Sequence, residues 1–226
     1  MSLFVQLVLA CAAFLATHFI SSTPLRARLV AAAGEKVYLG LYSLAAAATL
    51  GWMIYGYYHA PFLTLWYVPA LRYAPLLVMP FALILIVCGI LTRNPTAVGQ
   101  ERLLESSNAV QGILRVTRHP LMWGVALWAA SHVLARGDAA AAVFFGTFLV
   151  LALVGTAMSD RRKARALGER WQRFAAVTSH VPFVAIATGR NSFAPAEIGW
   201  ARPALGIGLY VVLLILHPLL FGARPY

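Results

Sequence analysis

Six histidines in a very apolar chain are the residues whose chemistry stands out: His18, His59, His119, His132, His180 and His217. An imidazole inside a bilayer is costly unless it is paired, so a histidine there indicates a polar partner, a ligand or a metal. Facing helices of a bundle can each offer one imidazole to an iron. The chain has no CxxCH motif, so a haem held by these histidines would be bound non-covalently.

Two arginines lie close to histidines where helices are expected to meet the membrane surface. Arg118 and His119 precede a proline in RVTRHPLMWG, and Arg26 follows His18 in HFISSTPLRAR. A helix N-terminus that carries cationic side chains favours anions. Arg26 and Arg118 are therefore candidates to hold haem propionates or another anion. The alternative is that Arg118 only anchors the chain at the lipid surface and that residues 21–23 only end the first helix.

Long apolar segments supply the elements that must position these residues. The chain has 226 residues, of which 61% are hydrophobic and 11% are charged, about half the charge of an average soluble domain. Six segments are read as membrane-spanning helices: residues 2–20, 37–58, 73–91, 119–135, 139–158 and 203–221. The sequence thus predicts one all-α domain over residues 1–226, an integral membrane bundle of about six transmembrane helices.

Lysine and arginine are sorted unevenly between the loops. Of the 18 such residues, 15 fall in residues 21–36, 92–118 and 159–202, whereas three lie in the other loops and the C-terminus. The positive-inside rule places the basic loops in the cytoplasm and both termini outside, which predicts a multi-pass protein of the bacterial inner membrane. The net charge of +11 then reflects topology and contact with anionic lipids, not nucleic acid. Residues 160–174 predict a cytoplasmic amphipathic helix.

This topology sorts the histidines by depth. His18, His119 and His180 belong toward the cytoplasmic face, and the remaining three toward the outer face. A metal lies about 2 Å from each ligand nitrogen, so histidines at opposite faces cannot share one iron. Depth therefore allows His59 with His132, or His18 with His119.

Several ordered motifs resemble those of the NnrU family of bacterial membrane proteins. They are HFISSTPLR, RVTRHPLMWG, LWAASHVLARGD and SDRRKARALGERWQRFAAVTSHVPF, which fall within residues 18–183. The likeness as a whole runs roughly from His18 through Gly189. NnrU proteins are associated with denitrification, which implies a role near nitrite and nitric oxide reduction. That role could be catalytic, or it could be that of a non-catalytic accessory or regulatory membrane protein.

The NnrU family is in turn similar to the plant 15-cis-zeta-carotene isomerases, which are haem b membrane enzymes. This similarity implies haem b as a cofactor, an apolar polyene as substrate, and roles for His18, His59 and His132, with His119 in the shared RHP motif. It also implies that His18 pairs with His132, although their predicted heights differ by roughly 20 Å at 1.5 Å per residue. The isomerases carry a cysteine three residues before the histidine that matches His132, whereas this chain has Ala129.

A second resemblance is to the isoprenylcysteine carboxyl methyltransferases and phospholipid methyltransferases. Their RHPxYxG motif and a later acidic helix bind S-adenosylmethionine, and the matching positions are Arg118, His119, Gly124 and Asp160. Trp123 replaces the usual tyrosine. Three functions therefore stay open: a haem-dependent isomerase-like protein, an accessory protein of nitric oxide metabolism, and an S-adenosylmethionine-dependent lipid methyltransferase.

Overall fold

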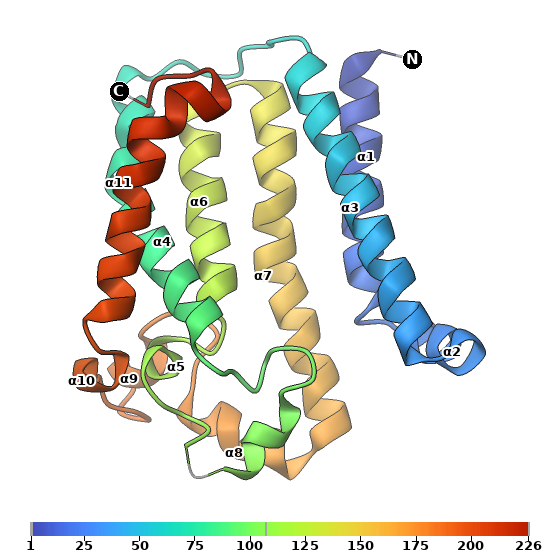
Figure 1. The fold of residues 1–226 in the computed structure, drawn as a ribbon, viewed down its shortest axis with the longest axis vertical. Coiled ribbons are helices and arrows are strands. Elements are labelled where there is room, and N and C mark those ends of the chain that lie inside the picture. The colour runs from blue at the N-terminus through green and yellow to red at the C-terminus, as the bar shows by residue number, and fades with distance from the viewer. Residues whose placement is uncertain (1, 107, 226) are drawn as a thin grey trace.

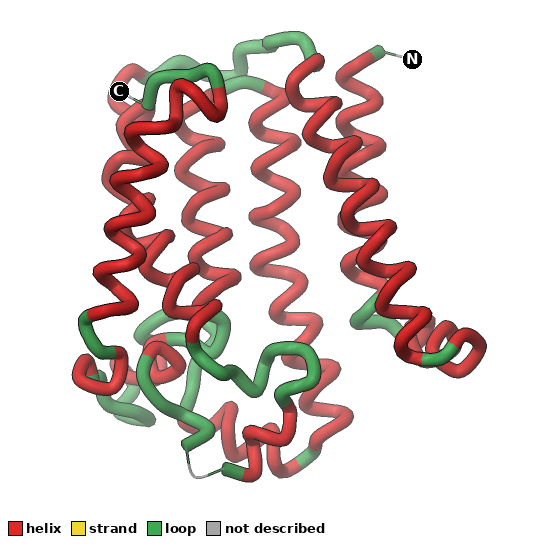
Figure 2. The backbone as a smooth tube through the Cα atoms, in the orientation of Figure 1, coloured by secondary structure: helices red, strands yellow, loops and turns green. Residues whose placement is uncertain are grey.

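The computed structural model describes residues 2–106 and 108–225, and helices are its regular elements in that part of the chain (Figure 2). The long helices are α1 (Leu3–Ile20), α3 (Glu35–His59), α4 (Ala74–Leu91), α6 (Pro120–Arg136), α7 (Ala139–Leu167) and α11 (Ala201–Phe221). They stand side by side as one bundle (Figure 1). The prediction of an all-α chain is confirmed.

Short helices connect the long ones. They are α2 (Pro24–Ala33), η1 (Pro69–Tyr73), η2 (Glu101–Glu105), α5 (Ile113–Val116), α8 (Glu169–Val177), α9 (Val184–Ala187) and α10 (Pro195–Ile198). Except for η1, they gather at one end of the bundle with the arginine-rich loops (Figure 1). We call this the basic end. The opposite end, called the far end, holds both termini, the α3–η1 connection and the α6–α7 hairpin (Figure 1).

Five segments are long and apolar enough to cross a membrane, which supports a membrane bundle. They are Leu3–Ile20, Glu35–His59, Pro69–Leu91, Ala139–Leu167 and Ala201–Phe221. The remaining predicted span corresponds to α6, which has 17 residues and packs against both α4 and α7. A total of six spans therefore stays a prediction.

The basic end differs from the prediction in two helices. The fifth long helix does not end at residue 158 but continues to Leu167, and the amphipathic stretch 160–174 is divided at Gly168, whose φ is +53°. Arginine, lysine, alanine and leucine favour helix, so residues 159–167 extend α7. The other difference is α2, which forms within the first predicted loop.

Small residues let α4 and α6 approach closely. A Cβ atom added at Gly124 of α6 would lie 2.6 Å from the carbonyl oxygen of Ala82 on α4. A Cβ added at Gly89 of α4 would lie 2.5 Å from the backbone nitrogen of Leu121. Reciprocal glycines of this kind are a common means of pairing helices in lipid, where van der Waals contact replaces the hydrophobic effect.

Candidate functional site

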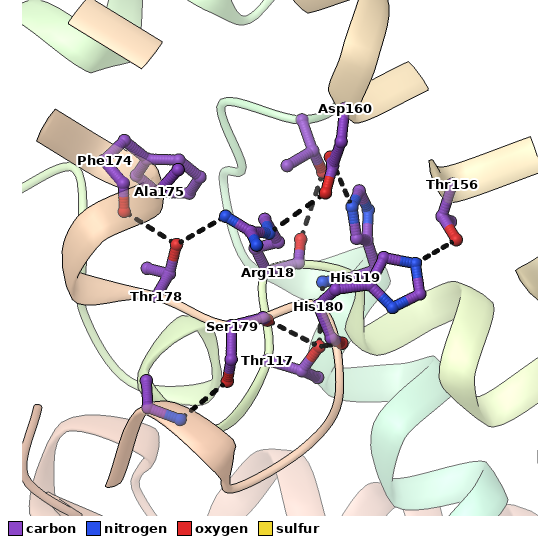
Figure 3. Close-up of polar contacts among 12 residues, drawn as sticks. Thr117, Arg118, His119, Thr156, Asp160, Phe174, Ala175, Thr178, Ser179 and His180 are labelled. Carbon is purple, nitrogen blue, oxygen red and sulfur yellow. Dashed lines mark hydrogen bonds and ion pairs between the residues drawn. The ribbon is translucent and has the colours of Figure 1, made fainter. Parts of the chain in front are cut away.

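Polar side chains from three parts of the chain meet at the basic end (Figure 3). We call them the basic-end cluster: Arg118, His119, Thr156, Asp160 and His180. The first two lie in the turn that leads into α6, Thr156 and Asp160 are one turn apart on α7, and His180 lies in the loop after α8. The tight start of α6 at Pro120, which suits a first helical turn, directs Arg118 and His119 toward α7.

The Asp160 carboxylate joins the two residues that precede α6. Its Oδ1 atom lies 2.8 Å from His119 Nε2, and its Oδ2 atom lies 3.2 Å from Arg118 Nε. The Arg118 Nε–H has no hydrogen-bond acceptor among the described residues, so its contact with Asp160 is an ion pair without an aligned hydrogen bond. The side chains of His119, Arg118 and Asp160 are 5%, 13% and 18% exposed. Water therefore screens these charges only weakly.

His180 completes the cluster through Thr156. The Thr156 hydroxyl lies 2.6 Å from His180 Nε2 and 2.6 Å from the Ala152 carbonyl oxygen. Because a hydroxyl has one proton, donation to Ala152 leaves its oxygen to accept the Nε2–H of His180. Burial and the adjacent His119 ring, whose centroid is 5.2 Å away, lower the pKa of His180. This ring is therefore neutral at neutral pH.

Hydrogen bonds to backbone carbonyl oxygens connect the same loops. The Arg118 N–H donates to the Ser179 carbonyl oxygen at 3.0 Å, and Trp123 Nε1 donates to the His180 carbonyl oxygen at 2.7 Å. Asn94 Nδ2 in turn donates to the Arg118 carbonyl oxygen at 3.0 Å. The loops that contain Asn94, Arg118 and His180 are therefore connected to one another, and the last two also contact α7 through Asp160 and Thr156. The Nε2 atoms of His119 and His180 already contact Asp160 and Thr156, so neither atom is available to a metal.

A large cavity lies toward the far end, among α3, α4, α6, α7 and α11. Its volume is about 800 Å³, within the range of small-molecule sites, about 300–1,000 Å³. Its walls are mostly apolar, and the aromatic lining side chains are Tyr57, Tyr58, Phe62, Trp128, Phe144, Phe145, Phe148, Tyr210 and Phe221. Residues of α3 and α11 contribute to its lining, as do residues of α6 and α7. Figure 1 shows α6 and α7 between α11 and α3 in the bundle.

Two histidines and three arginines line this cavity. The histidines are His132 on α6 and His217 on α11. His132 Nδ1 lies 2.8 Å from the Trp128 carbonyl oxygen, and His217 Nδ1 lies 2.7 Å from the Ala223 carbonyl oxygen. The arginines are Arg72, Arg136 and Arg224. Arg136 forms an ion pair with the buried Asp138, whose other oxygen caps α7.

The other predicted site residues lie elsewhere. His18 on α1 packs against the Phe14 and Tyr42 rings, and its Nδ1 lies 2.8 Å from the Phe14 carbonyl oxygen. Arg26 forms an ion pair with Glu35 at 2.9 Å.

His59 is exposed at the end of α3, where it stacks on Tyr55 and does not line the cavity. The structure therefore places His132 with His217, a residue outside the predicted site. The available signal was their spacing: each lies four residues before the end of its helix.

Comparisons with known proteins agree with the resemblance seen in the motifs. The sequence model of the family described as NnrU protein matches residues 6–225. The 15-cis-zeta-carotene isomerase of Arabidopsis thaliana is 35% identical over 120 residues, 50% of this chain and 31% of the isomerase. That of Zea mays is 37% identical over 80 residues, 35% of this chain and 22% of the isomerase. The aligned segments thus span a third or less of these relatives. No solved structure matches.

Proposed function

The chain belongs to the NnrU family, and from this premise we propose that it is a haem b-binding membrane protein that isomerises an apolar polyene. The far-end cavity is the observation that carries this proposal. It combines an apolar wall, two imidazoles and three guanidinium groups in about 800 Å³. The similarity to two carotene isomerases supplies the substrate class and the reaction type.

The residues of the cavity suit haem b on three counts. Imidazole nitrogen is a common axial ligand of haem iron, and His132 and His217 both line the space. Guanidinium groups pair with carboxylates such as the haem propionates. Aromatic and aliphatic side chains, including Trp128 and Phe145, give the flat macrocycle an apolar enclosure. Asp138 adds no unpaired negative charge, because Arg136 and the Ala141 N–H hold its oxygens.

The flanks of the cavity suit entry of a polyene from lipid. α3 packs against α1 and α11 packs against α4, so the two helices that line its sides belong to different helix pairs. Leu50 and Ile54 of α3 and Leu213 and Leu214 of α11 line its sides. A polyene dissolved in the bilayer would meet apolar side chains along this route and would not need to cross water.

Bound haem would supply a redox-active iron in the cavity. The chain would hold the polyene against the aromatic wall, exclude water and fix the imidazoles by their backbone hydrogen bonds. Cis–trans isomerisation by rotation about the double bond moves no proton, so a reaction of this kind needs no acid or base of matched pKa there. This agrees with the lining within residues 2–106 and 108–225, where the carboxylate is that of Asp138 and is already paired.

A second candidate is the lipid methyltransferase. It is favoured by the convergence of Arg118, His119 and Asp160, three positions of the methyltransferase-like motif. S-adenosylmethionine is a cation, however, and both oxygens of Asp160 already contact protein groups, Arg118 and His119. We therefore rank this function second. Binding of S-adenosylmethionine by the purified protein, measured by calorimetry and lost in Arg118→Ala, would reverse the order.

The test of the proposed function uses the full chain purified from cells that make a cis-polyene. We expect a haem absorption band that shifts on reduction, and a change in the cis/trans ratio of the polyene measured by chromatography. Ala135→Trp, which fills the cavity, should lower both, whereas Ala31→Trp on the exposed face of α2 should lower neither. Folded protein that takes up no haem and leaves the polyene unchanged would refute the proposal.

A further inference from the structure

We infer that His132 and His217 together ligate the haem iron, with Arg72 and Arg224 holding the two propionates. This inference rests on the proposed function, but it assigns a residue pair that differs from each pair expected from the sequence. The four side chains line one cavity and come from η1, α6, α11 and the segment after α11.

His132 and His217 lie at a similar height in the bundle. His132 lies four residues before the end of α6, and His217 lies four residues before the end of α11. Both helices end at the far end of the bundle (Figure 1). At 1.5 Å per residue, the two imidazoles therefore lie about 6 Å from their helix ends, at a similar height in the same cavity. His18 lies at the other end of the bundle, so height separates it from His132.

Protonation prepares both rings as ligands. A carbonyl oxygen only accepts, so the Nδ1 atoms that contact the Trp128 and Ala223 carbonyl oxygens must carry the proton. In a neutral imidazole the other nitrogen, Nε2, then has a free lone pair. Metal-bound histidines are commonly oriented in this way, by donation from the second ring nitrogen to a carbonyl oxygen. His59 has the same hydrogen bond at Tyr55, but it is exposed and outside the cavity.

Two of the three arginines that line the cavity lack an acidic partner among the described residues, which equals the number of propionates on haem b. Arg136 is already paired with Asp138. Arg72 and Arg224 have no acidic partner within residues 2–106 and 108–225. Haem b carries two propionates, so one guanidinium is available for each. Arg224 lies seven residues after His217, and both side chains line the same cavity.

The experiment is spectroscopic and uses the full-length holoprotein in detergent or nanodiscs. Optical, EPR and magnetic circular dichroism spectra of the wild type should show low-spin haem with two imidazole ligands. His132→Ala and His217→Ala should each convert it to high-spin haem, and added imidazole should restore the low-spin signal. The double variant should lose haem. The matched controls, His18→Ala and His59→Ala, should keep the wild-type spectrum.

A second set of variants guards against failure to fold. His217→Met preserves a ligand atom and should show the spectrum of mixed histidine and methionine ligation. Arg72→Gln and Arg224→Gln should speed transfer of haem to apomyoglobin several-fold without a change of spin state, whereas Arg28→Gln should not.

Two failures are distinguishable. Folded wild type that takes up no haem overturns both the proposed function and this inference. Wild-type haem whose low-spin spectrum survives in His217→Ala overturns the His132–His217 pair alone.

Discussion

His119 Nε2 lies 2.8 Å from Asp160 Oδ1, although 41 residues separate them in the chain. The contact joins the turn before α6 to the basic half of α7. It also accounts for the only acidic residue in the SDRRKAR segment. Because Asp160 also pairs with Arg118, one carboxylate holds two neighbouring residues of the RHP motif. The RHP motif therefore connects the start of α6 to α7 at the basic end.

Removing the Asp160 charge should destabilise this end. Breaking a buried ion pair from one side costs about 3–5 kcal/mol, and the 18% exposure of Asp160 reduces the expected loss to about 2 kcal/mol. We expect Asp160→Asn to lower the free energy of unfolding by that amount, measured by denaturant titration in detergent micelles.

The matched control is Glu105→Gln, which removes an exposed partner of Arg170. It should change the free energy of unfolding by less than about 1 kcal/mol. Equal losses in the two variants would show that the Asp160 contacts add no stability beyond that of a surface pair.

Enlarging Gly124 should separate α4 from α6. Its added Cβ would lie 2.6 Å from the backbone of α4 at Ala82, and overpacking of this kind costs about 1–3 kcal/mol. We expect Gly124→Ala to lower the thermal unfolding temperature. Gly146→Ala on α7, where an added Cβ meets nothing within 4 Å, should not lower it. A Gly124→Ala protein as stable as the wild type would contradict the close packing of these helices.

Acidification should loosen the loop that carries His180. Burial and the neighbouring His119 lower the pKa of His180 from 6.5. The unfolded chain then binds the proton more readily than the folded chain, so the stability from neutral His180 is complete above about pH 6.5 and is lost as pH falls through the lowered pKa. Asp160 and Arg118 face the same ring, with opposite effects on this pKa.

The measurement is hydrogen exchange of residues 178–183, corrected for the intrinsic dependence of exchange on pH. Protection should fall as the pH is lowered below about 6.5 and through the lowered pKa of His180. His180→Gln, which keeps a donor for Thr156 but does not titrate, should show a flat profile. A wild-type profile that is equally flat would contradict the prediction.

The orientation in the membrane is testable with single cysteines. The basic loops are expected in the cytoplasm, so a cell-impermeant maleimide should label Tyr67→Cys in intact cells and Glu169→Cys only after permeabilisation. Both positions are open, at 82% exposure for Tyr67 and 87% for the Glu169 side chain. Native Cys11 and Cys88 are buried and should give little background. The reverse labelling pattern would invert the topology.

Much of the architecture was predictable from local sequence. Apolar runs predicted the six long helices, because a bilayer-length helix needs a continuous stretch of such residues. The predicted helix ends differ from the structure mainly at the basic end. There, charged residues that favour helix extend α7 beyond its apolar part to Leu167. The NnrU resemblance, carried by ordered motifs, is confirmed by a family match over residues 6–225.

The depth of each histidine also followed from the sequence, since position along a helix sets height in the bundle. Which histidines face one another did not, because facing depends on how helices rotate and pack against distant partners. His59 had the required depth, yet it lies exposed at the end of α3. His217 had the same depth and lines the cavity with His132. Position along each helix settled the height of these rings, and tertiary packing alone decided which of them share a space.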